Sequence, residues 1–140
     1  MRFFIDEQSN PALEVLLNHI FRHHEFRTFQ QEKLAGTEDR DLFTILAARG
    51  FDVIVTDDRG QLQSRGDRTE RERLRAAPLH WVGYKRPNVG GPAGLAVAAG
   101  GLLSGFPAVL DALAAATVPT AITVRGSLRL PAQLIKVDAL

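Results

Sequence analysis

The chain has 140 residues, 45% hydrophobic and 24% charged, which is enough to bury one sizeable core, so we expect a single domain over residues 1–140. The formal net charge of +1 excludes binding to nucleic acid or membrane through overall charge alone, and any anion site must come from a local cluster. The absence of cysteine excludes a disulfide scaffold, a thiolate metal site and a cysteine nucleophile.

Five segments have the apolar composition of short strands and are bounded by turn residues. In chain order they are residues 2–5, 25–30, 52–56, 79–84 and 120–126, with the last expected at a sheet edge. Helical patterns separate the first strands. This alternation predicts an α/β fold built from βαβ units, with a parallel sheet and right-handed crossovers.

Two helices with an inward apolar face are expected between the first three strands. The first helix has Ser9 or Asn10 as a cap and Pro11 at its first position. Its apolar residues recur at helical spacing and predict one stripe against the core: Leu13, Leu16, Leu17, Ile20 and Phe21. The second helix covers residues 37–50, has acids in its first turn and ends at Gly50. Its expected inward residues are Leu42, Phe43 and Leu46.

The second half of the chain has weaker patterns. Residues 59–75 are basic and polar, and they predict a loop that leads into a short helix. Residues 93–117 predict helix with a break at Phe106-Pro107, and their small residues would allow a homodimer interface.

One uncharged stretch, residues 89–110, has to be compared with membrane helices, because about 20 apolar residues suffice to cross a bilayer. Its Gly and Ala content, with Pro92, Ser104 and Pro107, favours a pair of buried helices, and we expect no membrane contact. The opening MRFFIDEQ reaches two acids too early for a secretory signal. Together with the lack of cysteine, this predicts a cytoplasmic protein.

Three groups of acids fall at one edge of the predicted sheet. They are Asp6 and Glu7 after the first strand, Glu38, Asp39 and Asp41 at the start of the second helix, and Asp57 and Asp58 after the third strand. In open parallel sheets, ligands bind outside the carboxyl ends of the strands. The three groups are therefore expected to converge on one site.

Each acid also has a local explanation, for example a turn role for Asp58 or a helix-dipole role for Asp39. Several converging carboxylates repel one another unless a cation lies between them, and Mg²⁺ is a hard ion that prefers such oxygen ligands. We therefore favour a metal site. Carboxylate-held metal ions suit phosphodiester hydrolysis, which needs no histidine or serine nucleophile.

At these residues the sequence resembles the PIN-like domains, which include VapC-type toxin ribonucleases, and the subgroup that opens with an IDEN-like motif in particular. The matching stretches are RFFIDEQSNP at the start, Asp39 three residues before Leu42, and VIVTDD at the third strand. The resemblance implies a three-layer αβα, Rossmann-like domain with a central, mostly parallel sheet of about four to five strands. It also implies RNA cleavage dependent on Mg²⁺ or Mn²⁺, and a partner antitoxin protein.

The match assigns roles residue by residue. Asp6, Asp39 and Asp58 would be the catalytic and metal-binding acids, and Thr56 belongs to the matching motif. From their places in the sequence, Asp57, Glu7 and Asp41 are expected as secondary metal ligands, and Thr56 and Arg59, which directly follows the acids, are expected to bind the RNA substrate. Many relatives carry a further acid where this chain has Gly60, so Asp57 or Asp41 would replace it, or a single metal would bind tightly.

Two other function classes remain open. A receiver-like signalling domain also places acids after its first and third strands, but it needs a lysine on a later strand end, and Lys85 and Lys136 are poorly spaced. A catalytically weak binding module with the same fold would be consistent with Gly60.

Two charged segments have simpler explanations. His19 and His23 form the only i,i+4 histidine pair, and no third ligand shares their face, so a helix end is favoured over a metal site. The arginines of residues 65–75 alternate with acids, which slightly favours a solvated helix face over phosphate binding.

Overall fold

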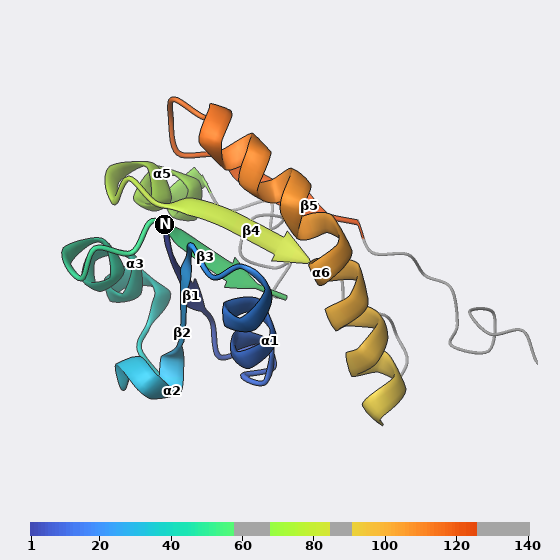
Figure 1. Cartoon of the computed structure of the whole chain (residues 1–140). Helices are drawn as coiled ribbons and strands as arrows, with labels where there is room; N and C mark the ends of the chain where they lie inside the picture. The colour runs from blue at the N-terminus through green and yellow to red at the C-terminus, as the bar shows by residue number, and fades with distance from the viewer. Residues whose placement is uncertain (58–67, 85–90, 126–140) are drawn as a thin grey trace, which may run out of the picture.

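The computed structural model of the protein describes residues 1–57, 68–84 and 91–125, which form an α/β fold around one five-stranded sheet (Figure 1). The strands are β1 (Arg2–Ile5), β2 (Glu25–Thr28), β3 (Val53–Thr56), β4 (His80–Tyr84) and β5 (Ala121–Val124). Their spatial order is β2-β1-β3-β4-β5, and every neighbouring pair is parallel. The strand segments and the parallel sheet expected from the sequence are confirmed, including β5 at an edge.

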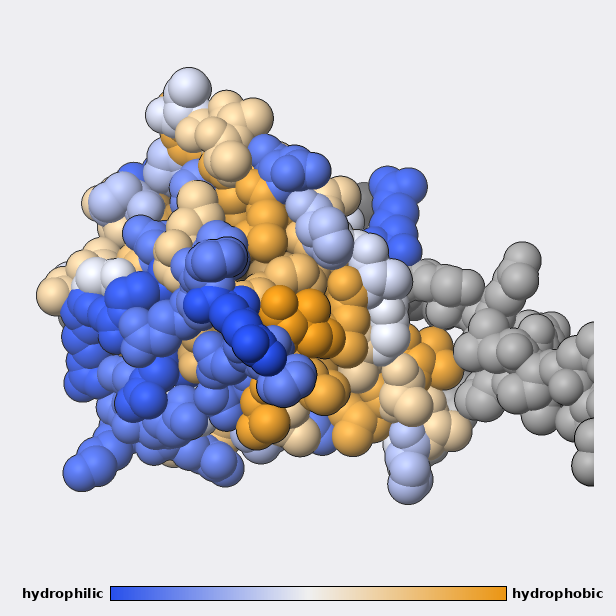
Figure 2. Space-filling view, in the orientation of Figure 1, coloured by the Kyte–Doolittle hydropathy of each residue, from blue (hydrophilic) through white to orange (hydrophobic). Residues whose placement is uncertain are grey.

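Helices cover both faces of the sheet, as a three-layer αβα domain requires. They are α1 (Leu13–Ile20), α2 (Phe29–Glu32), α3 (Asp39–Ala48), α5 (Arg68–Ala76) and α6 (Gly91–Ala115). Helices α1 and α6 pack on one face, and α3 and α5 pack on the other. Figure 2 shows hydrophobic residues gathered where α1 and α6 lie and hydrophilic residues on the side of α2 and α3.

Alternating strand residues build two apolar cores, because successive side chains point to opposite faces of a sheet. The first core, under α1 and α6, includes Phe3, Ile5, Val53, Val55, Val82 and Phe106. The second, under α3 and α5, includes Phe4, Leu42, Phe43, Leu46, Ile54 and Trp81. The inward face predicted for α3 is therefore confirmed, and Gly50 follows it with a φ of 74°.

Helix α1 differs from the prediction at its start and along its stripe. It begins at Leu13 rather than Pro11, because the Asn10 side chain accepts a hydrogen bond from the Ala12 N–H (2.8 Å) in a preceding turn. Only Leu13 and Leu17 are buried in the helix, whereas Leu16 and Ile20 are 45% and 54% exposed. The helix ends at Ile20, so Phe21 lies beyond it, where it is half-buried against the first core.

The second strand is shorter than predicted because a helix begins at Phe29. Thr28 forms a capping box, in which its hydroxyl accepts from the Gln31 N–H (3.3 Å) and the Gln31 side chain accepts from the Thr28 N–H (3.0 Å). This reciprocal pair starts α2 directly at the strand end.

The break expected at Phe106-Pro107 is wrong, and so is the pair of helices. Helix α6 runs without interruption through Pro107, which is exposed, while Phe106 and Val109 on the sheet side are buried. Gly105 lets the helix lie close to β5, since a methyl group there would approach Cγ1 of Val124 to 2.9 Å. By length and composition alone α6 could cross a membrane, but core helices pass the same test.

Candidate functional site

The carboxylate of Asp6 is the centre of the candidate site. Asp6 directly follows β1, and its backbone N–H donates to the carbonyl of Val55 on β3 (3.0 Å). The residue is only 5% exposed, which is unusual for an aspartate and costs free energy unless its oxygens are hydrogen-bonded. Such a placement is typical of a functional carboxylate rather than of a turn residue.

Thr56 at the end of β3 supplies one of the hydrogen bonds that Asp6 needs. Its hydroxyl donates to Oδ2 of Asp6 (2.9 Å), and Thr56 is fully buried. A donated hydrogen bond stabilises the ionised carboxylate and fixes its orientation. The ends of β1 and β3 are therefore joined through side chains as well as through the sheet.

Ser9 adds a second connection between these strand ends, which the sequence did not reveal. Its N–H donates to the Asp6 carbonyl (2.9 Å), and its hydroxyl donates to the Val55 carbonyl (3.5 Å). Ser9 is 3% exposed, so it is a buried connector and not the helix cap that was expected. Its spacing, three residues after Asp6 in a tight turn, is the only sequence signal for this role.

Glu7 connects the site to the loop that precedes α3. Its Oε2 accepts a hydrogen bond from the Gly36 N–H (3.1 Å), and Gly36 has a φ of 71°, which favours glycine. Glu38 then precedes α3 in an extended conformation, and Asp39 is the first residue of the helix. The segment after β1 and the start of α3 are thereby held at the same edge of the sheet.

The remaining predicted acids have varied positions. Asp57 follows Thr56 and is half-buried, and Asp41 lies exposed in the first turn of α3. Asp58 and Arg59 lie outside the described residues, as does the side chain of Asp39. Among the described residues, no group of three His, Cys, Asp or Glu side chains lies close enough together to hold a metal ion. His19 and His23 therefore have no third ligand in the described part of the chain.

The donor chemistry of the described part fits a hard divalent cation. Asp6 presents carboxylate oxygens at the carboxyl end of a parallel strand, and Asp57 and the backbone of Asp39 lie at the same edge. Oxygen ligands of this kind suit Mg²⁺ and Mn²⁺ and not the softer metals that take thiolates.

Comparison with known proteins identifies the fold family. A family model described as a PIN-like domain matches residues 1–84, from β1 to the end of β4. No curated protein and no solved structure matches the chain. Because the matched region covers more than half of the 140 residues, the protein belongs to the PIN-like domain family, whose members are generally nucleases that act on RNA with a divalent metal ion.

Proposed function

We propose that the protein is an endoribonuclease that depends on Mg²⁺ or Mn²⁺ and hydrolyses RNA phosphodiester bonds. One observation carries the proposal: a buried aspartate at the end of β1, hydrogen-bonded to Thr56 at the end of β3, lies within the region that matches the PIN-like domain. A buried carboxylate that is positioned by a neighbouring strand is what a metal ligand requires.

Asp6, Asp39 and Asp58 would hold the ion, with Asp57 and Asp41 as secondary ligands. When bound, the metal supplies a nucleophilic hydroxide at neutral pH and stabilises negative charge on the leaving oxygen. Arg59 follows the acids directly and would bind the substrate phosphate.

Two residues take more specific roles in the proposal. Thr56 orients Asp6, since its hydroxyl hydrogen is used there rather than on RNA. Glu7 positions the loop before α3, because Oε2 already accepts the Gly36 N–H, although its second oxygen could still serve as a secondary metal ligand.

The biological setting belongs to the same proposal. The protein would act in the cytoplasm as the toxin of a toxin–antitoxin pair and would be blocked by an antitoxin protein, as the resemblance to VapC-type toxins implies. The small residues of α6 and its length would also allow a homodimer.

The decisive experiment is cleavage of a mixed RNA pool by the purified protein with Mg²⁺, with Mn²⁺ and with chelator. The variants are Asp6→Asn and Asp58→Asn, which keep the side-chain shape and remove the charge. We expect each to lower the metal-dependent rate by at least about 100-fold, because each removes a ligand charge. Asp111→Asn makes the same chemical change on an exposed residue of α6 and should cut normally.

Cleavage that survives in Asp6→Asn would point to a contaminating nuclease and refute the assignment. A folded wild-type protein that binds metal but leaves RNA intact would favour the weak binding module. Isothermal titration with Mn²⁺ separates these cases, since metal binding is measured there without turnover.

A further inference from the structure

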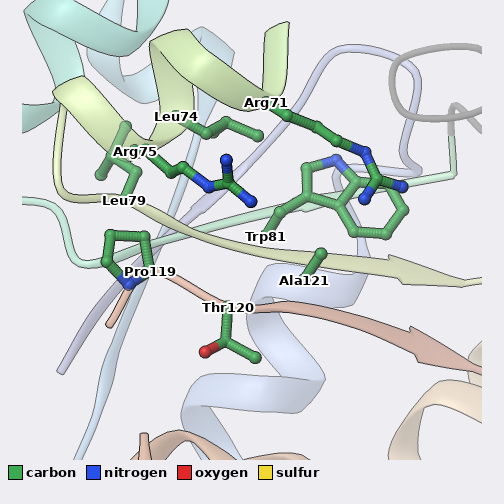
Figure 3. A pocket seen from close by; sticks show the side chains of 8 residues that line it. All are labelled: Arg71, Leu74, Arg75, Leu79, Trp81, Pro119, Thr120 and Ala121. Atoms are coloured by element: carbon green, nitrogen blue, oxygen red, sulfur yellow. The ribbon is translucent and has the colours of Figure 1, made fainter. Parts of the chain in front are cut away.

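A second candidate site lies between α5 and the start of β5, on the face of the sheet that α3 and α5 cover (Figure 3). It is a pocket of about 300 Å³ with Arg71 and Arg75 on one wall. Leu74, Leu79 and Trp81 form its apolar part, and Thr120 lies at its opposite side. The sequence slightly favoured a solvated helix face over phosphate binding for Arg71 and Arg75, and it gave the other lining residues no functional role.

The pocket exists because the layer of helices on this face is incomplete. Ala121 and Thr123 on β5 point to the same face as Trp81, and both are exposed, so the described helices leave this strand uncovered. Gly83, two residues after Trp81 on the same face, has no side chain, and the indole lies over it. The ring therefore lies along β4 and forms part of the pocket floor.

The described lining of the pocket is positively charged. Arg71 and Arg75 are one helical turn apart on α5, so both guanidinium groups lie on the same side of the helix, facing Trp81 and the start of β5 in Figure 3. The described lining contains no acidic residue. Among the described residues, no carboxylate forms an ion pair with Arg75.

We propose that this pocket binds a phosphate group of the single-stranded RNA substrate, so the proposal rests on the function proposed above. Guanidinium groups hold phosphate through paired, charge-assisted hydrogen bonds, and two of them on one wall match one phosphodiester. Trp81 is only 5% exposed, so the adjoining sugar would contact an edge of its ring rather than stack on the ring face.

The position of the pocket suits a contact remote from the acids. Trp81, at the end of the pocket nearer the acids, is paired with Ile54, two residues before Thr56, which puts it about 7 Å from the acidic edge along the strands. Leu79 and Thr120, at the amino ends of β4 and β5, lie farther from that edge. Strand β4 lies two strands from β1, which adds about 10 Å across the sheet. An extended stretch of a few nucleotides covers this distance, so one RNA strand would reach both places.

The test uses the fluorescence of Trp81, the single tryptophan of the chain, which reports on the pocket itself. The full-length protein is titrated in chelator, where metal-dependent cleavage is absent, with a single-stranded RNA of about ten nucleotides, a length typical of such sites. We expect the emission to change on binding. The variant Arg71→Ala/Arg75→Ala should bind at least about tenfold more weakly, because two phosphate-binding groups are lost.

Arg73→Ala is the matched control. It removes one positive charge from the same helix, half of what the double variant removes, and Arg73 lines a different hollow, with Phe43 and Ala47 of α3. Its RNA affinity should fall less than about threefold, since only non-specific charge is lost. The salt dependence of binding should also flatten in the double variant, by about 0.7 in log–log slope for each phosphate contact removed from a single strand.

Several results would overturn the proposal. One is a loss of RNA affinity in Arg73→Ala as large as that in the double variant. Another is unchanged RNA affinity in a double variant that is folded. A third is binding of inorganic phosphate as tight as that of RNA, which would indicate a site for free anions. Tighter binding of an acidic peptide than of RNA would point to a protein partner instead. If the wild type bound RNA as expected but never cleaved it, the proposed nuclease function would be refuted and the RNA-binding pocket would stand. If the wild type cleaved RNA normally and the double variant bound RNA with unchanged affinity, only the proposal for the pocket would be refuted.

Discussion

Residues 1–57 and residues 91–125 both contribute strands and helices to the fold, but the first region relies on side-chain hydrogen bonds and the second on apolar packing. The first region is joined between elements by side-chain hydrogen bonds, such as Thr56 to Asp6 (2.9 Å) and the Arg2 N–H to Asp52 (2.7 Å). In the second region, α6 contains one charged residue, Asp111, and it packs through an apolar face. That face consists of Gly94, Ala98, Leu102, Phe106, Val109 and Leu113.

A half-buried ionisable group in the first region, Glu32, shows the effect of directional hydrogen bonds. Burial alone raises the pKa of Glu32, but hydrogen bonds from Arg27 (3.0 Å) and Arg49 (3.0 Å) outweigh it and hold that pKa below its ordinary value. Hydrogen bonds fix atoms within tenths of an ångström, whereas apolar packing fixes only shape and volume. Asp6, the candidate catalytic acid whose side chain is described, lies in the region held by hydrogen bonds.

The largest effect that this comparison predicts is on stability, at Phe106. Phe106 is fully buried, and its ring centroid lies 5.4 Å from those of Phe3 and Phe26 and 5.0 Å from that of Phe21. Phe106→Ala should lower the free energy of unfolding by about 3–5 kcal/mol, because it leaves a cavity in the first core. Urea denaturation followed by circular dichroism measures this change.

The control for Phe106 is Val118→Ala, at a residue that is 66% exposed, which should change stability by less than about 0.5 kcal/mol. The folded fraction of Phe106→Ala should cleave RNA at the normal rate, since apolar packing of α6 does not position the acids. If the cleavage rate fell by more than the folded fraction did, packing of α6 would also affect the position of the acids, and the difference between the two regions would be wrong.

Thr56→Val should have a smaller effect on stability and a larger one on activity. The substitution keeps the volume and removes the hydroxyl that donates to the buried Asp6, which should cost about 1–3 kcal/mol of unfolding free energy. Cleavage should fall about 10–100-fold, as is usual when a group that orients a metal ligand is lost. Denaturation and single-turnover cleavage are measured on the same preparation.

Thr56→Ser keeps the hydroxyl and should retain most of the activity. If Thr56→Ser and Thr56→Val lost activity equally, the methyl group rather than the hydrogen bond would be the important part of Thr56. The orienting role proposed for this residue would then be wrong.

The smallest effect concerns pH and His24. Burial lowers the pKa of His24 from its ordinary value near 6.5, and the N-terminal ammonium and His23 lower it further. The folded state therefore binds the proton less readily than the unfolded state does. The His24 contribution to stability is complete above pH 6.5 and is lost as the pH falls through the folded pKa.

Thermal unfolding of the wild type should accordingly show a lower Tm at pH 5.5 than at pH 7.5. His24→Gln removes the titrating group, so part of this difference should disappear. An identical pH dependence in both proteins would show that other groups cause it.

Sequence patterns predicted the parts of the fold that depend on local periodicity. The apolar runs located all five strands, and the acids after β1 and at the start of α3 lie at one edge as expected. Positions set by tertiary contacts were missed, among them the buried role of Ser9 and the unbroken course of α6 through Pro107. A proline on the exposed side of a helix is tolerated when the opposite side is packed, and no local pattern reveals which side that is.

The candidate site could be predicted by residue type but not in detail. The hydrogen bond from Thr56 to Asp6 joins residues 50 positions apart, and that from Gly36 to Glu7 joins residues 29 apart. Spacing along the chain carries no information on such pairs. The pocket beside Trp81 was missed for the same reason, since it combines α5 with the start of β5.

Asn18 on α1 has a consequence for the behaviour of the protein at high concentration. Its amide group donates to the Phe26 carbonyl (2.9 Å) and accepts from the Phe26 N–H (3.0 Å), so it occupies the outer side of β2 much as another strand would. Strand β2 is an edge strand, and open edges recruit strands from other molecules. One side chain thus blocks the addition of a further strand to β2 at Phe26.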